Sequence, residues 1–163
     1  MSESAIYKHT FSVAASSIDV LGHVNNREYL RWTEEVSAKH AAALGWSLEA
    51  MLAEGAVWVA RSHWIEYLRP ALEGDEIDLY TWVESISAAA SLRRYAVASK
   101  GKLLAVAATE WVYVDAERHR PRLIPDHVAE SFPLVAPDDE RLAVLGIARE
   151  PRWMPSGRTT KGV

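Results

Sequence analysis

The residue types best suited to chemistry in this 163-residue chain gather in residues 19–29, which read Asp-Val-Leu-Gly-His-Val-Asn-Asn-Arg-Glu-Tyr. Asp19 can activate water as a general base or attack a carbonyl carbon as a nucleophile. His23, four residues later, can polarise a carbonyl group or water, or can hydrogen-bond Asp19. Each also has an ordinary structural use, since loop aspartates commonly cap turns. Their place in one short stretch makes them the candidate catalytic pair.

Gly22 precedes His23 in what reads as a turn, and glycine is the residue that most readily adopts a positive φ. In such a turn the amide of Val24, or of a neighbouring residue, can point at a carbonyl oxygen and stabilise the negative charge that develops there. A purely structural turn needs the same glycine. Gly22 and Val24 are therefore candidates for an oxyanion-binding turn.

A long helical pattern begins directly after this turn. A helix N-terminus offers unpaired amides and the positive end of the helix dipole, and both favour negative charge nearby. Asn25 with Glu28 three residues later matches a capping arrangement. We expect one of Asn25 and Asn26 to cap the helix and the other to orient a substrate or the carboxylate, and the sequence leaves open which does so. Tyr29 and Trp32, one turn apart, are expected in the core or in the wall of a pocket.

The elements that must position these residues follow from the apolar periodicity. We expect helices over residues 26–44, with Gly45 after the last turn, over residues 47–54, and near residues 126–131. Strands are expected over residues 5–13, 57–68, 77–85, 92–99 and 103–115.

The connections between the last four strands are short, and residues 73–75 and 100–102 read as turns. Short connections favour antiparallel neighbours, because a parallel crossover needs a dozen or more residues. There is no repeating βαβ alternation. The order therefore predicts an α+β fold in which an antiparallel sheet packs against one dominant helix.

One set of seven residues resembles a family signature without a gap: Asp19, His23, Val24, Asn25, Asn26, Tyr29 and Trp32. The signature, Asp-x-x-x-His-Val-Asn-Asn-x-x-Tyr-x-x-Trp, is that of hotdog-fold thioesterases acting on acyl-CoA or acyl-carrier protein, a 4-hydroxybenzoyl-CoA thioesterase-like group. The resemblance covers roughly residues 5–115. It implies a hotdog fold, with a five- to six-stranded antiparallel sheet wrapped around one long helix.

The resemblance also implies an activity, the hydrolysis of acyl thioesters to free acid and thiol. Asp19 and His23 would be catalytic, and Asn25, Asn26, Tyr29 and Trp32 would contact the substrate. It implies a homodimer or a dimer of dimers, and no cofactor. The plant acyl-carrier-protein enzymes carry polar residues where this chain has Leu21 and Gly22, which favours the small bacterial acyl-CoA thioesterases.

Two other functions compete with hydrolysis. A non-catalytic hotdog module that binds an acyl thioester or a protein partner would need no base, and the intact turn beside Asp19 disfavours it. Enoyl-thioester hydratases, which also use hotdog domains, place the histidine five residues after the aspartate in a Gly-Asp-x-Asn-Pro-x-His phrase. Here His23 follows Asp19 by four residues, and no Asn-Pro pair occurs.

Composition excludes several further classes. The absence of cysteine rules out disulfides, thiolate metal sites and a cysteine nucleophile, and fits a reducing compartment. The histidines show no short metal-ligand spacing, so no metal is expected. A net charge of −4 without a basic half argues against nucleic-acid binding. Lacking a signal-like start or a membrane-length apolar run, the protein is expected to be cytoplasmic and not membrane-associated.

The length fits one domain, which we expect over residues 1–148, followed by a flexible or subunit-contacting tail over residues 149–163. One basic cluster invites two interpretations: Arg93, Arg94, Lys100 and Lys102. These side chains could meet the phosphates of coenzyme A or an acidic carrier protein, but a solvated strand-and-turn surface is the favoured interpretation. Arg61, His63 and Glu110 are likewise expected to face solvent rather than a cleft.

Overall fold

The computed structural model describes residues 5–152 and 154–155. Five antiparallel strands in this part of the chain form one sheet: β1 (Ile6–Ser12), β2 (Ala56–Tyr67), β3 (Glu76–Ser87), β4 (Ala90–Ser99) and β5 (Lys102–Asp115). The helices are α1 (Asn26–Ala43), α2 (Leu48–Ala53), α3 (Asp126–Ala129) and α4 (Glu140–Leu145), with a 3-10 turn, η2, at Ala15–Ser17. The strand order across the sheet is β1-β3-β4-β5-β2.

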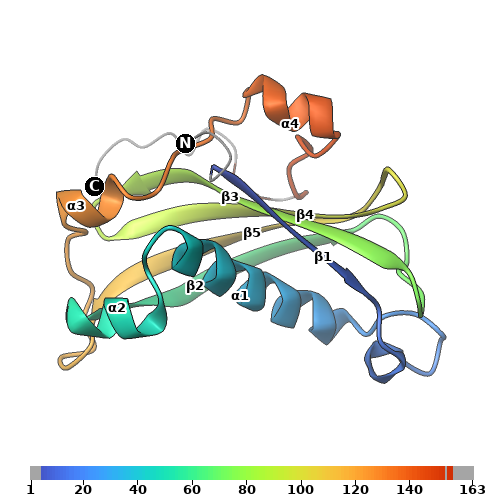
Figure 1. The fold of residues 1–163 in the computed structure, drawn as a ribbon, viewed down its shortest axis with the longest axis horizontal. Helices are drawn as coiled ribbons and strands as arrows, with labels where there is room; N and C mark the ends of the chain where they lie inside the picture. Colours follow the sequence, from blue (N-terminus) through green and yellow to red (C-terminus); the bar gives the residue numbers. More distant parts are fainter. Residues whose placement is uncertain (1–4, 153, 156–163) are drawn as a thin grey trace.

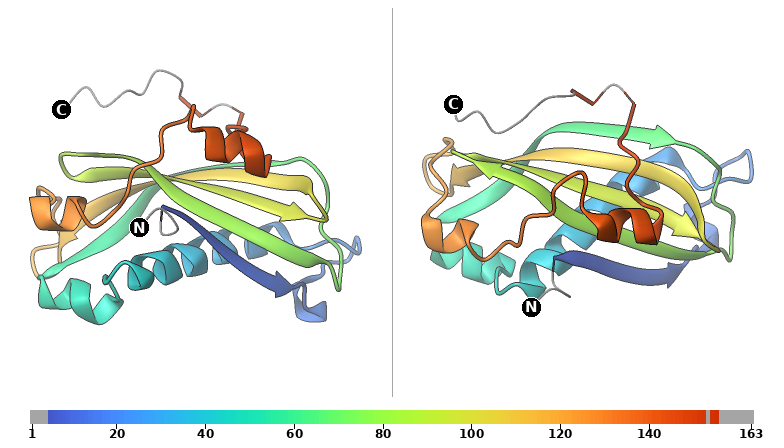
Figure 2. Two further views of the ribbon diagram at one scale, coloured as in Figure 1. Left: turned by 45° about the horizontal axis from the view of Figure 1, so that its top comes forward. Right: turned by 90° about the horizontal axis from the view of Figure 1, so that it is seen from above.

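The sheet has a different helix on each face. α1 lies along one face with α2 beyond its C-terminal end, whereas α4 lies on the opposite face (Figures 1 and 2). We call these the α1 face and the α4 face. A five-stranded antiparallel sheet around one long helix is the α+β hotdog architecture that the sequence predicts, and the prediction is confirmed.

The long helix forms where the apolar spacing predicts it. Its buried side chains recur three and four positions apart, from Tyr29 through Trp32 and Val36 to His40, which places them on one stripe facing the sheet. The helix ends at Ala43 with Leu44 as its C-cap, and Gly45 follows with a φ of 93°, the left-handed conformation that glycine adopts without strain.

The strands of the middle of the sheet are buried on both faces. Successive strand residues point to opposite sides, so Leu79 packs with α1 whereas its neighbour Tyr80 packs with Leu142 of α4 and with Ile147. At the end of β4, Lys100 and Gly101 have φ values of 51° and 72°, which gives the tight hairpin turn expected there.

The expected neighbour relation of β2 and β3 is wrong. β3, β4 and β5 are consecutive neighbours, but β2 pairs with β5 at the far edge of the sheet. The connection over residues 68–75 has a reach of about 26 Å when extended, and the three strand spacings that it must cross amount to about 14 Å. A connection that is short in sequence is therefore long enough to pass over the end of the sheet, where Leu68 and Arg69 both donate to the Leu104 carbonyl.

The interpretation of the basic cluster as a solvated surface is wrong for its two arginines. Arg93 and Arg94 are 5% and 0% exposed, although Lys100 and Lys102 are exposed. Both arginines lie on β4, in the middle of the sheet, where helices or the chain's C-terminal segment cover both faces. Arg61 is exposed and pairs with Glu110 at 2.7 Å, as expected.

Part of the predicted tail lies against the chain's own sheet. The Arg149 carbonyl accepts a hydrogen bond from Arg94, and Glu66 of β2 pairs with the Arg149 guanidinium at 3.1 Å. Met154 is buried beside Leu92. The other residues of the predicted tail, 153 and 156–163, lie outside the described residues, so its separation from the domain stays a prediction. No helix in the described part of the chain is long and apolar enough to span a membrane.

Candidate active site

The loop that carries Asp19 is closed by its own hydrogen bonds. The Asp19 amide donates to the His23 carbonyl at 2.8 Å, and the Gly22 amide donates to the Asp19 carbonyl at 3.1 Å. Gly22 has a φ of 78°, so this turn needs the conformation that glycine provides. Asp19 Oδ1 also accepts from the Leu21 amide at 2.8 Å and from the His23 amide at 3.4 Å.

This bonding leaves one carboxylate oxygen of Asp19 for chemistry. Among the described residues nothing donates to Asp19 Oδ2, and the residue is half-buried. The His23 side chain is exposed and has no hydrogen bond to Asp19, so the two predicted catalytic residues are joined through the loop backbone rather than through their side chains. The carboxylate is therefore held through Oδ1, and Oδ2 is left unbonded by the loop.

Val24 is not a free oxyanion donor. Its amide donates to the Ala71 carbonyl at 2.9 Å, and its side chain is buried in the core. The next amide, that of Asn25, donates to the Ser17 carbonyl at 2.8 Å. Asn26 is the first residue of α1, and among the described residues its amide has no acceptor. The donor that remains available at the helix N-terminus is therefore the Asn26 amide, one of the neighbours that the sequence left open.

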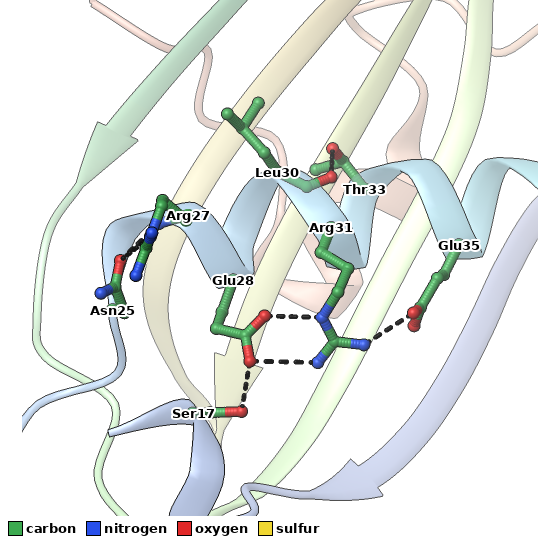
Figure 3. Close-up of polar contacts among 8 residues, drawn as sticks. All are labelled: Ser17, Asn25, Arg27, Glu28, Leu30, Arg31, Thr33 and Glu35. Carbon is green, nitrogen blue, oxygen red and sulfur yellow. Dashed lines mark hydrogen bonds and ion pairs between the residues drawn. The ribbon is translucent and has the colours of Figure 1, made fainter. Parts of the chain in front are cut away.

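The structure decides which asparagine caps α1. Asn25 is the N-cap, and its Oδ1 accepts from the Arg27 amide at 3.0 Å. Asn26 is the first helical residue, with an exposed side chain. Glu28 occupies the third helical position as expected, but its carboxylate does not return to the Asn25 amide. It accepts from Ser17 Oγ at 2.7 Å instead (Figure 3).

Arg31 ties the first two turns of α1 together. It donates to Glu28 Oε2 and to Glu35 Oε1, each at 2.6 Å, so one guanidinium lies between two carboxylates (Figure 3). The hydrogen bonds from Arg31 and then Ser17 lower the pKa of Glu28. The carboxylates raise the pKa of Arg31, chiefly through Glu28. This network fixes the direction of the helix N-terminus beside the Asp19 loop.

Tyr29 and Trp32 lie in an aromatic cluster behind the helix N-terminus. Both are buried, their ring centroids are 5.0 Å apart, and Tyr29 makes an edge contact with Tyr67 at 5.0 Å. Trp32 packs edge-on against Phe11 of β1. Burial raises the pKa of Tyr29, which keeps its hydroxyl protonated. These contacts place both residues in the core, and Trp32 also lines a cavity of about 200 Å³ beside Phe11 and Arg31.

α1 and β2 are in contact from the Asn26 end of the helix onward. At that end, Tyr67 Oη donates to the Asn26 carbonyl at 3.4 Å. Further along, His63 is hydrogen-bonded to Thr109 at 2.8 Å, and the charge of Glu34 acts on its imidazole. Burial lowers the pKa of His63, the larger effect on this group.

A cavity of about 170 Å³ lies beside the second half of α1. The cavity is lined on the helix side by Glu34, Ser37, Ala38 and Ala41, and its other residues come chiefly from α2 and strands β2 to β5. Sequence reasoning missed this cavity, because its lining is spread over six elements. Among the described residues there is no group of three metal-ligating side chains.

The turn, the helix N-terminus and the fold together define a hotdog domain of the thioesterase type. Residues 4–132 match the family model described as the N-terminal domain of acyl-ACP thioesterases. The chain therefore belongs to the acyl-ACP thioesterase family.

Individual proteins with similar sequences or structures are also known. The chain is 24% identical over 146 residues to the chloroplastic oleoyl-acyl carrier protein thioesterase 1 of Arabidopsis thaliana, which covers 84% of this chain but only 40% of that protein's length. An acyl-ACP thioesterase structure from Bacteroides thetaiotaomicron superimposes with a TM-score of 0.75, at 19% identity, over 83% of this chain and 56% of that one. A DHNA-CoA thioesterase from Staphylococcus aureus gives a TM-score of 0.71, at 21% identity, over 90% of this chain and 98% of that one.

Proposed function

We propose that the protein hydrolyses acyl thioesters, carried on coenzyme A or on acyl-carrier protein, to a free carboxylic acid and a thiol. The observation that supports this most directly is the pairing of a half-open carboxylate with an unpaired helix amide on one short loop. Membership of the acyl-ACP thioesterase family supports the same reaction.

Asp19 acts through Oδ2, the oxygen that the loop leaves unbonded. As a base it takes a proton from water, whose oxygen attacks the thioester carbonyl carbon; as a nucleophile Oδ2 attacks that carbon itself, and water hydrolyses the anhydride. In both routes the C–S bond breaks and the thiolate leaves, taking up a proton. The Leu21 and His23 amides hold Oδ1, so the carboxylate is oriented before substrate binds.

The thioester oxygen becomes negative when the carbonyl carbon is attacked. The Asn26 amide is suited to receive this charge, because it is unpaired and lies at the positive end of an 18-residue helix. His23, exposed at the end of the same loop, is placed to polarise the water or the leaving group. Asn25 contributes by starting the helix, and the substrate-contacting roles of Asn25, Asn26, Tyr29 and Trp32 stay predictions.

Replacing the carboxylate tests this assignment. Asp19→Asn retains an oxygen that can accept from Leu21 and His23, so the loop keeps its shape while the base is lost. We expect thiol release from acyl-CoAs and acyl-ACPs of graded chain length to fall by about 100-fold or more in kcat, the lower range of a general base contribution. Asp138→Asn, in the loop before α4 on the other face of the sheet, is the matched control and should retain the wild-type rate.

Three outcomes would contradict the proposal in different ways. No thiol release by the wild type from any acyl-CoA or acyl-ACP would remove the reaction itself. A full rate in Asp19→Asn would remove the role of Asp19. Loss of activity in Glu34→Gln with full activity in Asp19→Asn would transfer the base to the helix carboxylate that lines the cavity.

The assembly and the acyl carrier belong to the same proposal. β2 is an edge strand of twelve residues, and an edge of that length favours pairing with a second strand. This supports a homodimer joined through its sheets. Leu21 and Gly22 favour coenzyme A as carrier whereas the family match favours acyl-carrier protein, so both carriers belong in the assay.

A further inference from the structure

Arg93 places a positive charge at the wall of the cavity on the α1 face. The other described lining side chains are largely apolar, including Met51, Trp58 and Phe132, and Glu34 of α1 is the other charged residue among them. The cavity has a volume of about 170 Å³. An engineered apolar cavity of about 150 Å³ accommodates a benzene molecule. A ring or a short alkyl segment therefore fits the apolar part.

The guanidinium of Arg93 is buried without a carboxylate. Its Nη1 contacts His40 Nδ1 at 2.8 Å and Thr81 Oγ1 at 3.1 Å, and both of these partners are uncharged when they accept a hydrogen bond. No acidic oxygen of the described residues lies within 4.0 Å of it. Nε and Nη2 donate to no described residue, and neither is sealed inside the protein, so they are available to the cavity that the residue lines.

Such a group favours an anion over a neutral ligand. Burial lowers the pKa of Arg93, but a guanidinium remains protonated in proteins, so its charge persists in apolar surroundings. A buried charge is stabilised by an opposite charge with which it shares hydrogen bonds. Two free nitrogens on one planar fork match the two oxygens of a carboxylate.

The cavity is in line with the candidate active site. The helix residues that line it, from Glu34 to Ala41, follow Asn26 by about 12 to 22 Å of helical rise. α1 and β2 both pass from one place to the other, since Tyr67 contacts Asn26 at one end and Trp58 lines the cavity at the other. A ligand whose thioester lies at the helix N-terminus would reach the cavity by extending along α1.

We infer that the cavity binds the distal end of an acyl group that terminates in a carboxylate, and that Arg93 determines this specificity. The inference rests on the proposed function for the thioester end of the ligand. A free acid with an apolar body and a carboxylate has the same chemistry at Arg93, so the experiment must distinguish an acyl substrate from a free acid.

The first arm compares acyl-CoAs that are matched in length, end in a carboxylate or a methyl group, and are long enough to reach the cavity from the helix N-terminus: dodecanedioyl with dodecanoyl, tetradecanedioyl with tetradecanoyl, and hexadecanedioyl with hexadecanoyl. In the wild type we expect at least one carboxylate-ended substrate to exceed its partner about tenfold in kcat/KM, the ratio that one charge-assisted hydrogen bond provides. Arg93→Met should remove this preference, with the loss in kcat/KM about tenfold greater for the carboxylate-ended substrate than for its methyl-ended partner. Arg93→Lys, which keeps the charge but not the fork, should retain part of it.

The second arm measures binding without hydrolysis. Asp19→Asn is titrated with the same acyl-CoAs and with free dodecanedioate, tetradecanedioate and hexadecanedioate. The intrinsic tryptophan fluorescence is followed, to which Trp58 and Trp111 in the cavity wall contribute. Tighter binding of carboxylate-ended acyl-CoAs than of their methyl partners supports the inference even if no substrate is hydrolysed. Such a result would separate a failure of the proposed function from a failure of the Arg93 site.

Two results would overturn the inference. Equal affinities within every matched pair would reduce Arg93 to a tether between β4, α1 and β3, and this comparison needs only a protein with its native Arg93. Binding of the free acids without any preference among the acyl-CoAs would remove the acyl substrate as the ligand.

Discussion

Arg93 and Arg94 are neighbours on one strand, but their side chains lie on opposite faces of the sheet and have different hydrogen-bond partners. Arg94, on the α4 face, donates to Glu84 at 3.0 Å and to the Arg149 carbonyl at 2.8 Å, with Glu150 at 3.7 Å and the Trp82 ring beneath it. Arg93, on the α1 face, has uncharged partners and a cavity.

The difference assigns the two faces different roles: Arg94 contributes to the structure of the α4 face, whereas Arg93 on the α1 face is available to recognise a ligand. The α4 face is closed by the chain's own C-terminal segment, and its buried cation is neutralised internally. The α1 face has the candidate active site at one end and a cavity at the other, with a buried cation that forms no ion pair with any carboxylate of residues 5–152 or 154–155. Charge pairing thus distinguishes the two faces more clearly than burial does, because both arginines are almost fully buried.

The largest expected effect compares the same substitution at the two arginines. Arg94→Met removes the 3.0 Å ion pair with Glu84, whose side chain is 7% exposed. Removing one member of a buried ion pair costs about 3 to 5 kcal/mol in the free energy of unfolding. Arg93→Met leaves only neutral partners, so we expect a loss of about 1 to 2 kcal/mol. Urea denaturation of both variants measures the difference, and equal losses would contradict the contrast between the faces.

An intermediate effect compares the packing of the two faces. Ala96 is fully buried with Trp82 on the α4 face, whereas Ala41 lines the cavity on the α1 face. Ala96→Leu should destabilise the protein by about 1 to 3 kcal/mol through overpacking. Ala41→Leu extends into open space, and its cost should stay below about 1 kcal/mol, since leucine also suits a helix. Thermal unfolding of the pair tests this, and a greater loss in Ala41→Leu would show that the cavity does not accept a side chain.

The smallest expected effect is a change in the free energy of unfolding with pH, which arises on the α1 face. Burial lowers the pKa of His63 in the folded protein. As the pH falls below about 6.5 the unfolded chain takes up a proton there before the folded protein does, so stability decreases toward acid. Solvent screens this half-exposed group, so the change should stay below about 1 kcal/mol.

His63→Gln should therefore reduce the loss of unfolding free energy between pH 7.5 and pH 5.5. The control is His119→Asn, at an exposed turn where φ is 55° and asparagine is tolerated. An unchanged pH dependence in His63→Gln would place the acid sensitivity elsewhere.

The sequence predicts the elements well but not all of their neighbours. The expected helices and strands begin and end within about two residues of their expected bounds, because apolar spacing and glycine turns determine them locally. The short helix α4 and the turn η2 had no expected bounds. The place of β2 is not a local property. Residues 68–75 are long enough for either a hairpin or a passage over the sheet end, and only the packing of β2 on β5 decides between them.

The candidate site shows the same limit at the level of single residues. Asn25 and Asn26 are equally good caps by type, and the choice depends on where the chain enters the helix. Val24 is excluded as a donor by Ala71, a residue almost fifty positions away. The burial of Arg93 and Arg94 escaped prediction because a strand covered on both faces carries no polar side to recognise.

The Asp19 turn is held mainly by hydrogen bonds among its own residues, from Asp19 to His23. The cavity that the inferred acyl end would occupy is built by other segments altogether. Substitutions in α2, β3 or β4 can accordingly alter which acyl group is accepted while the turn stays intact. In evolutionary terms, a change of substrate and the retention of the reaction would be independent steps on this scaffold.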